Sequence, residues 1–183
     1  MPDTRTNVRL PFVLVCFVTS GCLDFGKVDD AKAPGDMLGI FAVESKLKES
    51  TCGDDALGAG DHWNFDVKLS RSANDLFWLN GREAIVGSIE SDGRSFSFET
   101  RIEQEITPAK PGRPGCSVAR DDMATGRLSD SGSDVESFSG SLRFRFRPLG
   151  NSDCSSWLGT EGAVTALPCS ITYAMDAERK SDD

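Results

Sequence analysis

The chain has 183 residues, a length typical of a single domain. It carries 29 acidic and 20 basic side chains, which gives a formal net charge of −9. Nucleic acids and anionic lipid headgroups attract clusters of Lys and Arg, so this balance argues against both as partners.

The first residues have the composition of an export signal. Arg5 and Arg9 supply positive charge, residues 10–18 are apolar apart from one proline, and residues 19–21 are small. An export signal needs a cationic start, an apolar run of roughly 7 to 15 residues and a small-residue cleavage site. The run is too short to span a bilayer, which needs about 20 apolar residues. We therefore expect residues 1–21 to be a signal peptide.

A cysteine follows the small residues directly. Residues 19–21 (TSG) and Cys22 resemble the lipobox of bacterial lipoproteins, in which an aliphatic residue and two small residues precede the cysteine; here Thr19 occupies the aliphatic position and Val18 stands one place earlier. The resemblance implies that Cys22 becomes a lipidated N-terminus, because two or more acyl chains make anchoring stable. Leu23, in place of Asp, favours the outer membrane by the same resemblance. The alternative is a plain secretory peptide, which would leave Cys22 as an ordinary thiol.

Four further cysteines remain in the exported chain. An even number in an oxidising compartment implies two disulfides, and three pairings are open. We prefer Cys154 with Cys169 and Cys52 with Cys116. A four-cysteine zinc site is the alternative, but the spacing contains no CxxC motif, so we expect no metal.

The rest of the chain alternates between apolar and polar residues in short runs, which is typical of half-buried strands. Asn80-Gly81 and Asp92-Gly93 separate some of these runs, and such dipeptides are strong hairpin signals. After a tether at residues 22–37, the pattern predicts eight strands within a domain at residues 38–176, followed by a disordered end at 177–183. We expect strands at residues 38–43, 63–70, 76–79, 84–89, 95–106, 116–128, 138–147 and 163–175.

Eight antiparallel strands, each with one apolar face, bury that face by closing into a barrel or by forming a sandwich. We prefer an all-β, eight-stranded up-and-down barrel with two disulfides, with a β-sandwich as the alternative. In strand count and in the opening Gly39-x-Phe41, the domain resembles the lipocalins, which implies a ligand cavity. The loops at residues 47–61, 80–83, 107–115 and 148–162 would gather at one end, braced by the disulfides, and admit a ligand there.

Candidate contact residues lie in one loop and on one strand. Trp157, in the loop before the last strand, is a candidate for touching a ligand or partner. Arg143, Arg145 and Arg147 stand in one row about 7 Å apart on a strand, and either bind an anion or a partner or pair with carboxylates across the strands.

Catalytic signals are weak. The single histidine, His62, sits at the start of a strand, and Ser45-x-x-Lys48 stands without the companion motifs of penicillin-binding enzymes. The acidic pairs Asp54-Asp55 and Asp121-Asp122 lack the spacing of a calcium loop. We expect no catalytic residues and no cofactor.

The sequence therefore predicts a membrane-anchored lipoprotein of the bacterial cell envelope that acts as a non-enzymatic binding or surface module. Its partners would be the membrane, through Cys22, and a small lipophilic ligand or an envelope protein, with no nucleic acid. A lipocalin-like carrier of a small lipophilic molecule is the first alternative. A hydrolase is the second.

Overall fold

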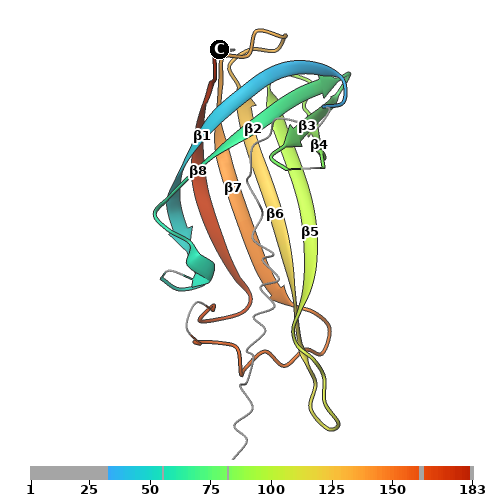
Figure 1. Cartoon of the computed structure of the whole chain (residues 1–183), viewed down its shortest axis with the longest axis vertical. Coiled ribbons are helices and arrows are strands. Elements are labelled where there is room, and N and C mark those ends of the chain that lie inside the picture. Colours follow the sequence, from blue (N-terminus) through green and yellow to red (C-terminus); the bar gives the residue numbers. More distant parts are fainter. Residues whose placement is uncertain (1–32, 55, 82, 161–162, 182–183) are drawn as a thin grey trace, which may run out of the picture.

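The protein is a closed eight-stranded antiparallel barrel in which each strand pairs with its neighbours in the sequence (Figure 1). The structure, a computed structural model, describes residues 33–54, 56–81, 83–160 and 163–181. The prediction of an up-and-down barrel is confirmed, and the sandwich alternative is wrong. The strands are β1 (Asp36–Ser50), β2 (His62–Ser72), β3 (Asp75–Leu79), β4 (Ile85–Ile89), β5 (Ser95–Thr107), β6 (Cys116–Leu128), β7 (Ser137–Pro148) and β8 (Cys169–Arg179).

The barrel closes because the first strand pairs with the last. On one edge β1 pairs with β2, from Asp36 opposite Arg71 to Lys46 opposite His62. On its other edge it pairs with β8, where Ser50 lies opposite Ile171. Closure removes the open edges of the sheet.

Two strands differ from their predicted bounds. β1 continues to Ser50, seven residues beyond the predicted end, because its polar second half still pairs with both neighbours. β8 begins at Cys169 rather than 163, immediately after Pro168, which has no N–H to donate to a ladder. β8 also runs to Arg179, with Ala177 buried, so the expected disordered end at residue 177 begins too early.

One end of the barrel is filled by aromatic side chains. The Phe96 ring lies 5.7 Å from those of Phe98 and Phe138, and Trp78 lies 5.4 Å from Phe98. The inward-facing Gly126 makes room for this packing, since a Cβ there would lie 2.5 Å from the Phe96 ring. We call this the closed end; it carries the loops between β2 and β3, β4 and β5, and β6 and β7.

The barrel wall is low at β3 and β4. Each has five residues, whereas the strands beside them, β2 and β5, have 11 and 13. β4 pairs with β5 only at Phe96 to Phe98, so the part of β5 from Glu99 onward extends beyond the end of β4, downward in Figure 1. We refer to β3 and β4 as the low wall.

Both disulfides form, but with other partners than the preferred ones. Cys52 bonds to Cys169 and Cys116 bonds to Cys154, so the preferred pairing is wrong. The physical reason is barrel closure, which brings the end of β1 beside the start of β8 and so places Cys52 against Cys169. The start of β6 likewise lies beside the end of β7, where Val118 is opposite Pro148, and the following loop carries Cys154 back to Cys116.

The predicted signal peptide and lipidated Cys22 lie outside the described residues. Of the predicted tether at 22–37, the structure describes residues 33–37, and Asp36 and Met37 already belong to β1.

We expect each disulfide to stabilise the barrel strongly. The bonds span 117 and 38 residues, and by the chain-entropy model bonds of this span contribute roughly 4 to 5 kcal/mol each. Replacing Cys52 and Cys169 together by Ser, or Cys116 and Cys154 together, should lower the free energy of unfolding by about that amount in a denaturant titration. Non-reducing peptide mapping checks the pairing first; a peptide that joins Cys154 to Cys169 would contradict it.

Candidate functional site

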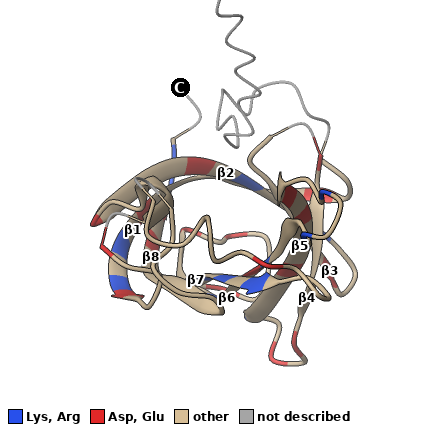
Figure 2. Ribbon diagram, turned by 90° about the horizontal axis from the view of Figure 1, so that it is seen from below, with Lys and Arg blue, Asp and Glu red and all other residues tan. Residues whose placement is uncertain are grey.

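The other end of the barrel, which we call the mouth, carries four loops, among them the two longest of the barrel (Figure 2). They connect β1 to β2, β3 to β4, β5 to β6 and β7 to β8, so the prediction that these loops gather at one end is confirmed. Two of them are bonded together: the Thr165 N–H and hydroxyl both donate to the Cys52 carbonyl, at 2.7 and 3.0 Å. Both loops are also held to the rim by a disulfide.

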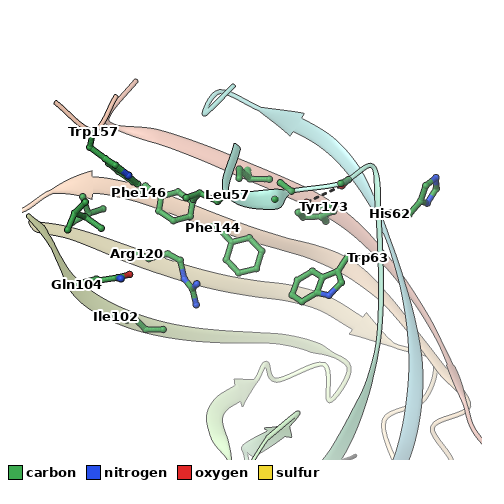
Figure 3. A pocket seen from close by; sticks show the side chains of 16 residues that line it. Leu57, His62, Trp63, Ile102, Gln104, Arg120, Phe144, Phe146, Trp157 and Tyr173 are labelled. Carbon is green, nitrogen blue, oxygen red and sulfur yellow. Dashed lines mark hydrogen bonds between the residues drawn. The ribbon is translucent and has the colours of Figure 1, made fainter. Parts of the chain in front are cut away.

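A cavity of about 380 Å³ lies inside the mouth (Figure 3). We call it the mouth cavity. Its lining is mainly apolar and comes from the β1–β2 loop, the start of β2, the loop before β8 and the mouth-side ends of β5 to β8. Residues that line only this cavity include Leu57, Gln104, Ile106, Phe146, Trp157 and Tyr173.

A second cavity, of about 450 Å³, lies deeper and beside the low wall. We call it the side cavity. Asn80, Gly81 and Glu83, in the loop between β3 and β4, form its rim. Residues that line only this cavity also include Phe65, Trp78, Ile85, Phe98, Thr100 and Asp122.

The two cavities share four side chains, which we call the waist: Trp63, Ile102, Arg120 and Phe144. The Trp63 and Phe144 rings lie 5.9 Å apart. Ile102 faces the interior, yet 45% of it is exposed, because the low wall leaves it uncovered. The aromatic residues therefore divide the interior at the mouth end into two compartments rather than filling it.

An ion pair lies inside the barrel at the waist. The Arg120 guanidinium donates from Nε to Asp122 Oδ1 and from Nη2 to Asp122 Oδ2, both at 2.8 Å. The same guanidinium lies over the Phe144 ring, 5.5 Å from its centroid (Figure 3). The side chains of Arg120 and Asp122 are only 25% and 15% exposed. Buried charges need such pairing, because an isolated one is costly in an apolar interior.

Burial raises the pKa of the Asp122 carboxyl group, and the adjacent Arg120 opposes this rise only in part. The carboxylate is therefore less stable inside the barrel than in water, even with its partner in place.

The β1–β2 loop is held over the mouth by Tyr173. This side chain is buried on β8, and its hydroxyl donates to the Gly60 carbonyl at 3.2 Å (Figure 3). Burial raises the pKa of Tyr173, and the nearby Asp61 adds to the effect. The neutral phenol, which donates this bond, is thus the stable form.

The predicted contact residues lie in two different places. Trp157 lines the mouth cavity, half-buried under the rim. The three arginines alternate with the inward-facing residues of β7 and line neither cavity. Arg147 donates to Asp121 at 2.9 Å and thereby lowers the pKa of that carboxyl group, while Arg143 contacts the Met123 sulfur at 3.5 Å. The row is thus partly paired across the strands.

The weak catalytic signals are not brought together. His62 is exposed and lines the edge of the mouth cavity, with its ring turned away from the other lining side chains (Figure 3). Ser45 is buried whereas Lys48 is exposed, so they do not share a site. Asp121 and Asp122 face opposite sides of β6, and no group of His, Cys, Asp and Glu among the described residues is arranged to hold a metal ion.

No family model, curated protein or solved structure matches the chain. Within the part of the chain that the structure describes, no helix is long and apolar enough to cross a membrane.

The Arg120–Asp122 pair is not predicted from the sequence. Asp122 enters the predictions only as half of an acidic pair, and the strand prediction for β6 does not say which of its residues face inward. A signal was present, since Val118 and Ala124 are apolar and occupy the same face as Arg120 and Asp122 at intervals of two residues. Charged residues within such an apolar series indicate polar groups inside a barrel.

Tyr173→Phe should loosen the β1–β2 loop while leaving the ring packing in place. Loss of one such bond costs about 1 kcal/mol, so amide hydrogen exchange at Ala59, in this loop, should become several-fold faster. Ser155→Ala is the matched control, because it removes a side-chain hydrogen bond within the other rim loop. Unchanged exchange at Ala59 in Tyr173→Phe would show that the Gly60 contact does not hold the loop.

Proposed function

We propose that this protein binds a small, mainly apolar molecule inside its barrel. The observation that carries the proposal is the pair of adjoining cavities of about 380 and 450 Å³ at the mouth end. Small-molecule sites are typically concave, of roughly 300 to 1,000 Å³, apolar and aromatic in lining, with a few polar groups. Both cavities have these properties.

The contrast between the two ends of the barrel supports binding over a purely structural role. The closed end is packed with aromatic rings in mutual contact. A scaffold with no ligand would gain stability from the same packing at the mouth, because protein interiors are normally close-packed. Instead Ile102 and Trp157 remain partly exposed around open volume.

A role as an outer-surface module is the second candidate. The row of Arg143, Arg145 and Arg147 favours it, but Asp121 already engages Arg147, so less of the row is free for an anionic partner. A hydrolase has less support still, because the described cavity residues contain no nucleophile and base in contact.

The proposal includes anchoring. Lipidation of Cys22 would hold the barrel at the surface of a membrane of the cell envelope, and the two disulfides are in keeping with an exported protein. A tethered barrel of this kind would bind its ligand next to the membrane.

Ile102→Trp tests ligand binding. The new indole would occupy the waist, so the affinity for a neutral, environment-sensitive dye such as N-phenyl-1-naphthylamine should fall at least about tenfold in a fluorescence titration, equivalent to about 1.4 kcal/mol. Val86→Trp is the matched control: Val86 is also an exposed aliphatic strand residue, 57% exposed, but lies on the outer face of β4. Equal dye binding by wild type and Ile102→Trp would contradict binding at the waist.

Cys22→Ala tests the anchor. In a bacterial host the variant should move from the membrane fraction to the soluble fraction, because the acyl chains that hold it would not be attached. Immunoblots of the two fractions measure the change, and Cys16→Ala, within the segment expected to be removed, serves as the control. A variant that remains in the membrane fraction would argue against lipidation.

A further inference from the structure

The Arg120–Asp122 pair determines the balance of charge inside the barrel. Among the described residues, Arg120 is the only Lys or Arg that lines either cavity. The acidic residues that line them are Asp122, bonded to Arg120, and Glu83, exposed at the rim of the side cavity. The positive charge of Arg120 is thus already balanced from within the barrel.

This balance disfavours charged ligands. A carboxylate bound at Arg120 would add a second negative charge beside Asp122 in a site with little water, and an unpaired buried charge is costly. An ammonium group would face the guanidinium itself, which is held against both oxygens of Asp122. An uncharged ligand avoids both penalties.

The pair still has hydrogen-bonding capacity. Arg120 has five N–H donors, of which Nε and one on Nη2 go to Asp122. For the remaining donors no acceptor is found among the described residues. A ligand carbonyl or ether oxygen could accept a hydrogen bond from one or two of them.

The position of Arg120 adds a geometric condition. It lies at the waist, where the mouth cavity and the side cavity meet, with apolar side chains on both sides. A polar group at Arg120 therefore has one apolar compartment on each side of it. We propose that the ligand is an uncharged molecule with two apolar arms joined by a hydrogen-bond acceptor, such as an internal ester, that binds Arg120. This rests on the proposed function and names the class of ligand.

Displacement of the bound dye by a set of compounds of equal chain length tests the proposal. Hexyl hexanoate has a central ester, methyl undecanoate a terminal ester, tridecane no polar group, and tridecanoate and tridecylamine a charged end. We expect hexyl hexanoate to bind about tenfold more tightly than tridecane, since a hydrogen bond to a charged group is worth that much. We also expect it to bind more tightly than methyl undecanoate and the two charged compounds.

Two double variants locate the effect. Arg120→Met with Asp122→Leu replaces the whole pair by apolar side chains, which buried sites often tolerate, whereas removing one partner would leave an unpaired charge. This variant should lose the preference for hexyl hexanoate, so that its affinities for hexyl hexanoate and tridecane become about equal. Arg147→Met with Asp121→Leu removes an ion pair between β7 and the outer face of β6, the strand that carries the interior pair, and should keep the preference.

The outcomes separate the two proposals. If the dye itself does not bind, the barrel does not bind apolar molecules and both proposals fail; if the dye binds but none of the compounds displaces it, only the ligand class is wrong. If tridecane binds but hexyl hexanoate binds no better, or the interior double variant keeps the preference, only the ligand class is wrong. Tighter binding of tridecanoate or tridecylamine than of the central ester would overturn the uncharged ligand, and tighter binding of methyl undecanoate would overturn the two-armed one.

Discussion

The pairing of β1 with β8 is the constraint on which the rest of the structure depends. Without it the sheet would have two open edges and its apolar face could not be enclosed. The same pairing brings Cys52 to Cys169 and so holds the β1–β2 loop at the rim. It also lays Tyr173 of β8 beneath that loop, within reach of the Gly60 carbonyl. A contact between the two ends of the domain thus builds the mouth.

The barrel is stabilised at one end and hollow at the other. Phe96, Phe98 and Phe138 bury large apolar surfaces at the closed end, and inward-facing glycines let their rings fit. The mouth end has less apolar packing, but disulfides and loop hydrogen bonds hold it instead. Covalent bonds therefore replace core packing where open volume is kept. The two cavities meet at the waist, and the interior ion pair lies there as well.

Local patterns predicted the strands well, and non-local contacts were harder. Alternation along β2 and β7 indicated which faces are buried, and Asp92-Gly93 indicated a hairpin turn. Both signals depend on residues that are near one another in the sequence. The cysteine pairing depended on which distant strand lies beside β1, and the preference for Cys154 with Cys169 joined neighbours in sequence instead. Arg120 and Asp122 are harder to predict as a site, because their side chains become enclosed only when the barrel closes around the inward face of β6.

Because β3 and β4 have only five residues each, a bound molecule could enter and leave the barrel on a side that the disulfides do not hold. In the order of strands around the barrel, the disulfides fasten β1 to β8 and the β7–β8 loop to β6, on the side opposite the low wall. A molecule leaving past Asn80 and Glu83 would cross a hairpin that neither bond restrains. The dissociation rate of a ligand would then depend on the fluctuations of this hairpin. Reduction of the disulfides would destabilise the folded barrel without directly changing that dissociation rate.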